Sequence, residues 1–572
     1  MNPRTRFSTP LAPLLCPIFL SLTFTFLAHP SAAQDESVEQ LCKTLLSETH
    51  KKQPYEQNER EVALHKLARR DSVPAVKCLV QALTDPFQHI RQEAVYWMQE
   101  EVQSASVIKW LSNKGLQLRH PAARKNVVRT LSRLADPSMI GNLKPLAEDG
   151  GPALQRAVAE AVRRIAPQRV PGYLLQLAAS NNEQVAAEAI RTMGTIPDPR
   201  VSSYLRNNIR SLSGRPLAEA TLALGRHAPD GCVQVLKTLL NHDSWQVRVM
   251  ALRGFLALEQ EQTNSSFQQT FKAARTAFKD GNWHVRAAAV DVLARTWTRD
   301  AIPVLLDGFE QANGRLRLDF MRALQTMTGE DLKWNPLNWK SWWSQHKEDL
   351  ELGDQPENWR AGVAMTGKEK EQQNTDSFFG VPMVSNRVMF VMDFSGGMSS
   401  EVESGEYEGQ TKIEIAKQEL GNTIKKLNKK KRFNVLVHQY RSTFPPETRI
   451  LSPFKKGRAL VPARPQAQAA AYRWVSKLKA SGWGAFYEAF RAATRSPAVD
   501  TIVFLSDGKP TRGKFAGTTA VMDDRFFEQL QEMNRYRQVM IHTVLTGAKA
   551  GGTDADYLKR IADLTGGIFQ KF

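Results

Sequence analysis

A motif that returns about every thirty residues constrains the fold of this 572-residue chain more than any other feature. Each copy contains a helix, a turn that carries Asp, and an apolar–Arg–x–x–Ala entry into a second helix. Because one pair of helices cannot bury its own apolar face, neighbouring pairs must stack. The sequence therefore predicts an α-solenoid over residues 60–350. The slot of the repeated arginine falls at Arg91, Arg124, Arg156, Ala186, Ala218, Arg248, Arg286 and Arg317.

The units resemble short HEAT repeats, and this resemblance implies a concave surface that binds other proteins. We expect the repeated arginine to reach the Asp of a turn in its own or an adjacent repeat. The interval from Arg248 to Arg286 is longer than the others, which predicts a longer loop near Glu261–Ser266. Tryptophans are dense between Trp334 and Trp343. We interpret this stretch as a cap on the last repeat, with a sugar-binding platform as the alternative.

The C-terminal third alternates strand and helix patterns, which is typical of a doubly wound, mostly parallel sheet. Strands are predicted at Val388–Asp393, Phe433–Tyr440, Thr501–Asp507, Val539–Leu545 and Gly567–Phe569. Helices are predicted near Lys412–Leu427, Ala467–Leu478, Phe486–Thr494, Asp523–Arg535 and Asp554–Leu564.

Two of these strands end at an aspartate, and a serine lies close to the first. Asp393 ends one apolar run and is followed by Ser395, while Asp507 ends another. Open α/β sheets bind ligands at the carboxyl ends of their strands, so these side chains are expected to lie at one rim. Carboxylate and hydroxyl oxygens suit a hard cation such as Mg²⁺. The alternative is that both aspartates only cap the helix and turn that follow them.

Three motifs identify a family for this region, which spans roughly residues 385–572. They are Asp393-x-Ser395-Gly396-x-Met398-Ser399, Leu505-Ser506-Asp507-Gly508-x-Pro510 and Leu558-x-x-Ile561-Ala562-x-x-Thr565-Gly566-Gly567-Ile568-Phe569. Together they resemble a von Willebrand factor type A domain, which has a Rossmann-like fold. The resemblance implies a metal-ion-dependent adhesion site in which Asp393, Ser395 and Asp507 bind Mg²⁺ (or Mn²⁺ or Ca²⁺) and a partner's carboxylate completes the shell.

The sequence departs from this family's metal motif at two positions. Gly397 stands where the motif has a second serine, and Gly484 stands where it has a threonine. Water could replace both hydroxyl ligands, but fewer protein ligands should lower the affinity for the ion. The site is therefore a degenerate one, and a scaffold that has lost its metal is an alternative.

Residues 1–33 are predicted to form a signal peptide, with Arg4 and Arg6 before an apolar stretch and a small-residue exit at Ser31-Ala32-Ala33. We therefore expect an exported protein in the periplasm, at the cell surface or secreted. Residues 34–59 form a polar N-terminal segment, and residues 351–384 are predicted to be a linker. Three cysteines remain in the mature chain. The sequence leaves undecided whether Cys42 and Cys78 form a disulfide, and Cys232 is expected to be buried.

Charge and composition narrow the class of partner and of function. The formal charge of +19 becomes +17 when the two arginines of the signal are removed. Outside the cytoplasm, proteins are the expected partners, acidic polysaccharides or a membrane surface are further candidates, and nucleic acid is not expected. A solvated basic surface without a partner is the plainer interpretation.

No persuasive catalytic set is present. The leading hypothesis is a non-enzymatic interaction or adhesion scaffold; the alternative is an envelope metal-assisted hydrolase or processing factor.

Overall fold

The computed structural model describes residues 36–47, 57–134, 137–261, 267–356, 359, 377–403, 405–441, 447–454, 460–508, 510, 520–547 and 552–572. The predicted signal peptide, the predicted long loop at 262–266 and residues 360–376 of the predicted linker lie outside the described residues. The chain divides into two units after Ser37, and the helices and strands named here belong to the compact unit Val38–Phe572.

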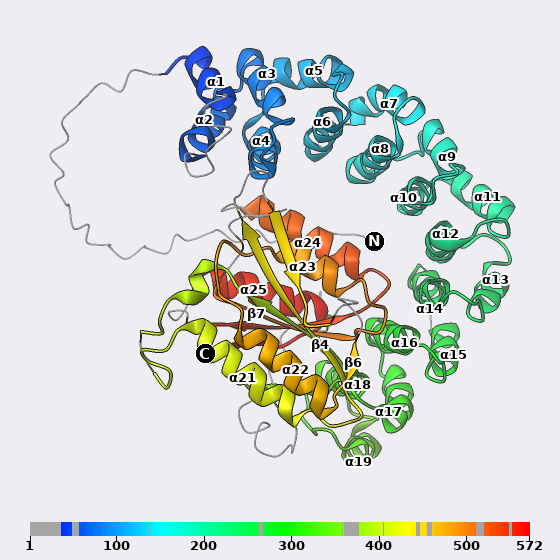
Figure 1. The fold of residues 1–572 in the computed structure, drawn as a ribbon. Helices are drawn as coiled ribbons and strands as arrows, with labels where there is room; N and C mark the ends of the chain where they lie inside the picture. The colour runs from blue at the N-terminus through cyan, green and yellow to red at the C-terminus, as the bar shows by residue number, and fades with distance from the viewer. Residues whose placement is uncertain are drawn as a thin grey trace, which may run out of the picture. The chain divides into compact units, whose positions relative to one another are not determined.

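Paired helices confirm the predicted solenoid, and Figure 1 shows the second helix of each pair on its inner side. Two helices, α1 (Val38–Leu46) and α2 (Gln57–Arg69), precede the pairs. The first helices of the pairs are α3 (Val73–Ala82), α5 (Ala105–Asn113), α7 (Lys144–Glu148), α9 (Gly172–Ala178), α11 (Pro199–Asn208), α13 (Cys232–Leu239), α15 (Gln268–Ala277) and α17 (Ala301–Gln311). The inner helices are α4 (Gln88–Glu101), α6 (Pro121–Arg133), α8 (Pro152–Ile165), α10 (Glu183–Met193), α12 (Gly214–His227), α14 (Trp245–Gln260), α16 (Trp283–Thr296) and α18 (Arg315–Thr328).

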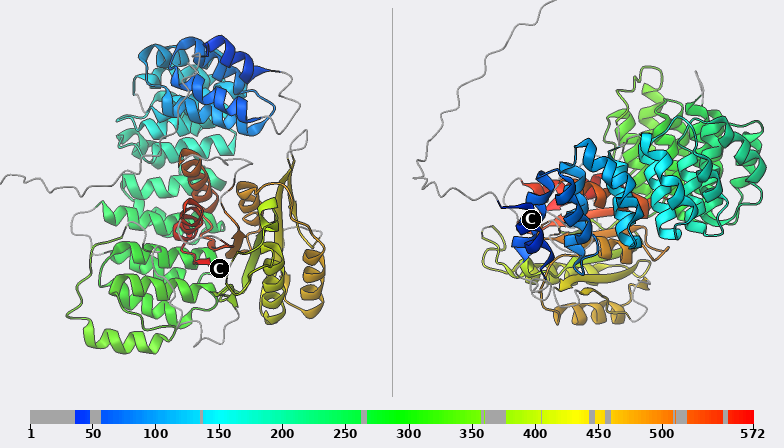
Figure 2. Two further views of the ribbon diagram at one scale, coloured as in Figure 1. Left: turned by 90° about the vertical axis from the view of Figure 1, so that its left-hand side faces the viewer. Right: turned by 90° about the horizontal axis from the view of Figure 1, so that it is seen from above.

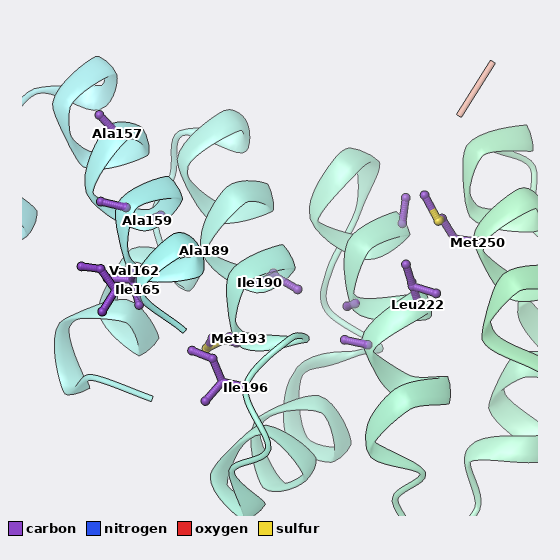
Figure 3. Packing of buried hydrophobic residues seen from close by; sticks show 14 of the residues in the cluster. Ala157, Ala159, Val162, Ile165, Ala189, Ile190, Met193, Ile196, Leu222 and Met250 are labelled. Carbon is purple, nitrogen blue, oxygen red and sulfur yellow. The ribbon is translucent and has the colours of Figure 1, made fainter. Parts of the chain in front are cut away.

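Small residues let successive inner helices approach closely, as Figure 3 illustrates for Ala159, Ala189 and their neighbours. The helices α12 and α14 approach one another closely, since a Cβ at Gly225 would lie 2.1 Å from the carbonyl oxygen of Gly254. Glycine inside a helix costs about 1 kcal/mol relative to alanine. The tight contact between the two backbones explains why glycine occupies this position.

Three of the repeated arginines, Arg91, Arg248 and Arg286, reach the aspartate of a turn as predicted, whereas Arg156 donates to the side chain of Gln184 and Arg317 to the carbonyl of Trp334. Arg248 forms an ion pair with Asp280 of the next repeat, with Nε donating at 2.7 Å, and it also donates to the carbonyls of His242 and Asp243 in its own turn. Arg91 and Arg286 donate to the carbonyls of Asp85 and Asp280. These bonds tie α4, α14 and α16 to the turn before each of them, and Arg248 also ties one repeat to the next.

A disulfide and a tryptophan-rich helix close the two ends of the solenoid. Cys42 of α1 is bonded to Cys78 of α3, with their Cα atoms 5.7 Å apart. At the other end, α19 (Pro336–His346) carries Trp339, which is buried and donates its indole N–H to the carbonyl of Lys333 at 2.8 Å. The burial of Trp339 agrees with the cap interpretation of this stretch.

The C-terminal region is a mixed, mainly parallel sheet, consistent with a von Willebrand factor type A-like fold. Its order is β5-β4-β3-β7-β8-β9, and the inner neighbours from β4 to β9 pair in parallel. The parallel strands are β3 (Arg387–Asp393), β4 (Arg432–Arg441), β7 (Thr501–Ser506), β8 (Met540–Leu545) and β9 (Phe569–Lys571). Two strands that the sequence did not predict, β5 (Glu447–Leu451) and β6 (Val461–Pro462), pair antiparallel with β4.

Helices cover both faces of this sheet (Figure 1). The helices α21 (Lys412–Lys426) and α22 (Pro465–Ser476) pack on one face, which Figure 2 shows turned away from the solenoid. The helices α23 (Phe486–Ala493), α24 (Ala520–Asn534) and α25 (Thr553–Thr565) pack on the other, where Trp283 and Leu316 of the solenoid join the same apolar cluster.

The ends of the predicted linker are ordered parts of the two regions. Trp359 is 4% exposed in the solenoid core, and its indole N–H donates to Asp291 at 3.2 Å. Near the other end, a short hairpin of β1 (Ser377–Phe378) and β2 (Val381–Pro382) buries Phe378 against the sheet. The two regions therefore extend into residues 351–384.

Among the described residues, none of the helices has the length and apolarity that a membrane crossing requires.

Candidate functional site

The predicted residues Asp393 and Asp507 lie at the same rim of the sheet. The strand order reverses around β3, because β4 follows it along the chain on one side and β7 lies on the other. Met392 of β3 pairs with Leu505 of β7, so the strands end side by side. The Ser506 hydroxyl donates to Asp393 Oδ2 at 2.7 Å, and the backbone N–H of Ser395 donates to Asp393 Oδ1 at 2.8 Å.

The two glycines that depart from the metal motif adjoin these carboxylates. A Cβ at Gly397 would lie 2.0 Å from Asp507 Oδ2. A Cβ at Gly484, in the loop before α23, would lie 3.3 Å from Asp393 Oδ2. The Asp507 carboxylate therefore occupies the space that a side chain at position 397 would need.

The charges at the rim are close enough to influence one another. Burial raises the pKa of Asp393, and hydrogen bonds from Ser506 and Ser395 oppose this shift. Burial and then the charge of Asp393 raise the pKa of Asp507 to about 6, while Lys412 opposes them. Lys412 brings a positive charge to this rim, and its Nζ lies 3.9 Å from Asp507 Oδ2. Nothing in the sequence connects Lys412 with the two strand ends.

His438 is a second residue at the rim that sequence reasoning did not place there. It pairs with Asp393 in the register of β3 and β4, and its Nδ1 lies 4.0 Å from Asp393 Oδ1. Nδ1 accepts the backbone N–H of Ala485 at 3.2 Å. Burial lowers the pKa of His438 to about 3, so the ring is neutral. It fixes the loop that carries Gly484, and a polar residue within an apolar strand was its only sequence signal.

The donor set at this rim fits a divalent ion poorly. Mg²⁺ requires about six oxygen ligands at about 2.0–2.1 Å in a nearly octahedral arrangement. Both carboxylate oxygens of Asp393 already accept hydrogen bonds from the protein, and Asp507 stands beside an ammonium group. Within the described part of the chain, no group of three or more His, Cys, Asp or Glu side chains could hold a metal.

The raised pKa of Asp507 predicts a dependence of stability on pH. Since the carboxyl binds its proton more tightly in the folded state than at its ordinary pKa of 3.8, folding is favoured at low pH. The free energy of unfolding should fall by about 3 kcal/mol from about pH 3 to about pH 7 through this group. Urea unfolding across this range should show a shallower fall for Asp507→Asn than for wild type. Parallel curves for the two proteins would contradict the shift.

A second candidate site is a cavity of about 1180 Å³ between inner helices of the solenoid and α24. Side chains along α24 and just after it contact four of the inner helices in turn. These contacts are Arg525 with Gln99 of α4, Glu528 with Arg164 of α8, Glu532 with Arg191 of α10, and Arg535 with Glu219 of α12. The cavity beside this row is lined by charged side chains of both signs, with arginine in slight excess. The arginines are Arg156, Arg163, Arg164, Arg191, Arg226, Arg253, Arg295 and Arg535, and the acidic residues are Glu160, Glu188, Glu261, Asp291, Glu528 and Glu532.

Comparisons with known proteins agree with the helical repeats. Residues 76–163, 108–194 and 233–325 match the family model described as HEAT repeats. No curated protein matches the chain.

Solved structures give weaker similarities. A von Willebrand factor type A structure from Catenulispora acidiphila is 21% identical over 34% of this chain and 40% of its own, with a TM-score of 0.25. An engineered protein is 18% identical over 55% and 89% of the two chains, with a TM-score of 0.27. Human deoxyhypusine hydroxylase in complex with glycerol is 18% identical over 45% and 95%, with a TM-score of 0.19. The chain thus spans less than half of the von Willebrand factor type A structure, and none of these scores supports an inference about function.

Proposed function

We propose that this protein is an exported, non-enzymatic scaffold that binds an acidic segment of a partner protein on the inner side of its solenoid. HEAT repeats suggest a protein-interaction scaffold. The cavity in which arginines outnumber acidic side chains is the observation that carries the more specific proposal. Charge complementarity of this kind directs which partners associate and in which orientation.

Arg226 is an arginine of this cavity that could receive an external carboxylate. It has no carboxylate partner within ion-pair distance among the described residues, and its Nη1 is 3.5 Å from the carbonyl oxygen of Gly194. Burial and the neighbouring Arg535 lower the pKa of Arg226, which marks an electropositive position. A bound carboxylate would relieve both effects by placing a negative charge beside the guanidinium group.

The disulfide between Cys42 and Cys78 supports export, because such bonds persist in oxidising compartments outside the cytoplasm. The predicted signal peptide agrees with this proposal. Mass spectrometry of the protein from its host should give a mature chain that begins after Ala33 and retains the disulfide.

Full-length protein carrying Arg226→Glu tests the proposed binding surface, with a fluorescent glutamate-rich peptide as the probe. The variant should bind this peptide about tenfold more weakly than wild type, which corresponds to one lost charge-assisted hydrogen bond. Fluorescence anisotropy at fixed salt concentration measures the affinity. Arg206→Glu is the matched control, since Arg206 is a half-exposed residue on the outer helix α11.

The outcomes of this titration separate the kinds of partner. Equal loss in both variants would mean that only net charge attracts the peptide, and the proposed site would be wrong. Binding of a sulfated polysaccharide or of anionic vesicles, without binding of the peptide, would instead favour the polysaccharide or membrane partners.

A further inference from the structure

The position of Lys412 is not explained by the helix in which it lies. It is the first residue of α21, directly after Thr411, whose side chain forms a capping box with Glu414. Cations are disfavoured near a helix N-terminus because the free N–H groups there carry partial positive charge. The side chain of Lys412 is also only 14% exposed, and covering an ammonium group costs solvation energy. Some other interaction must therefore favour lysine at this position.

The Lys412 side chain passes over the backbone of Gly547 on its way to the rim. A Cβ at Gly547 would lie 2.5 Å from Lys412 Cε, so any other residue there would displace the lysine from this position. Gly547 follows β8 and has a φ of +64°, which also favours glycine. The stem crosses this glycine and brings Nζ to within 3.9 Å of Asp507 Oδ2.

Both carboxylates of the rim are thus held by groups of the protein itself. Asp393 accepts hydrogen bonds from Ser506 and from the backbone of Ser395. Asp507 has the Lys412 ammonium beside it and fills the space next to Gly397. The rim departs from an oxygen-lined cation site in two independent ways. Hydroxyls are missing at positions 397 and 484, and a lysine lies beside one of the carboxylates.

We infer that the ammonium group of Lys412 takes the place of the divalent cation at this rim, so that Asp393 and Asp507 are held without a metal. The positive charge of the lysine side chain then partly neutralises the carboxylates, as Mg²⁺ does in an oxygen-lined site. The rim consequently cannot recruit a partner's carboxylate by opening a coordination position on a metal. This inference concerns the rim alone and is independent of the partner site proposed on the solenoid.

Full-length Lys412→Met tests the inference, with Mn²⁺ as the probe and thermal unfolding and electron paramagnetic resonance as the readouts. Wild type should bind no Mn²⁺ at the rim, and its unfolding temperature should not respond to millimolar Mn²⁺ or to a chelator. Lys412→Met should unfold at a lower temperature than wild type. Mn²⁺ should raise that temperature by about 2–4 °C, and this response should disappear in Lys412→Met/Asp507→Asn.

Lys426→Met is the matched control, because Lys426 is an exposed lysine at the other end of the same helix, and it should behave as wild type. Mn²⁺ binding by wild type that Asp507→Asn abolishes would overturn the inference. So would a Lys412→Met protein that is as stable as wild type and indifferent to Mn²⁺. If Lys412→Met does not fold, the response of wild type and Asp507→Asn to Mn²⁺ still decides the question.

Discussion

Replacing Glu219 with alanine should lower the free energy of unfolding by about 3–5 kcal/mol, the cost of breaking a buried ion pair on one side. Glu219 of α12 is 3% exposed. Its carboxylate accepts bonds from Arg535, with Nε at 2.8 Å, and from the Tyr536 hydroxyl. Burial raises the pKa of Glu219, but Arg535 and Tyr536 outweigh it and the net shift is downward. The alanine variant would leave the Arg535 charge covered and unpaired.

Denaturant unfolding measures the loss, and hydrogen exchange locates it at α12 and at the end of α24. The double variant Glu219→Met/Arg535→Met is the control. Removing both charged partners and keeping the volume should recover most of the lost stability, because no uncompensated charge remains. If the single and double variants lost equal stability, the ion pair would not be the reason for the loss.

Replacing both Cys42 and Cys78 with serine should destabilise the N-terminal repeats by about 4 kcal/mol, since the bridge closes a loop with a sequence separation of 36. The bridge joins α1 to α3, and stability in a stacked array depends mainly on neighbouring units. Hydrogen exchange should therefore accelerate in α1 to α3 and change little in α15 to α18. Reduction of wild type should reproduce the effect, and a reductant should not affect the variant. A variant as protected as oxidised wild type would contradict the expectation.

The solenoid could be predicted because its signal is local and recurs along the chain. The arginine slot alone predicted that Arg248 binds the aspartate of a turn, and Arg248 pairs with Asp280 of the next repeat. Where the slot holds alanine, as at Ala186, other residues form the hydrogen bonds between the turn and the inner helix. Asn182 caps α10 there by accepting the backbone N–H groups of Gln184 and Val185.

The rim was predictable only in part. Buried parallel strands end at a common edge, so Asp393 and Asp507 could be placed together from two apolar runs. Lys412 belongs to a helix, and nothing in its sequence context indicates that its side chain turns toward the strand ends. The strands β5 and β6 were missed because they are short and lie at the edge of the sheet, where the alternation of apolar residues is weak.

The contacts along α24 lay beyond sequence reasoning for a different reason. Glu219 and Arg535 are 316 residues apart, and nothing in the sequence around either residue indicates the other. Their pairing depends on the position of α24 on the inner side of the solenoid (Figure 1).

The row of contacts along α24 also has a mechanical consequence. A stacked helical array bends by small rotations between neighbouring pairs, and such rotations add up along its length. A single stiff helix joined at intervals to α4, α8, α10 and α12 opposes those rotations, since bending would pull at least one contact apart. Tension applied to the N-terminal repeats should therefore extend this protein little until the contacts of α24 break. After that, the array should extend more easily.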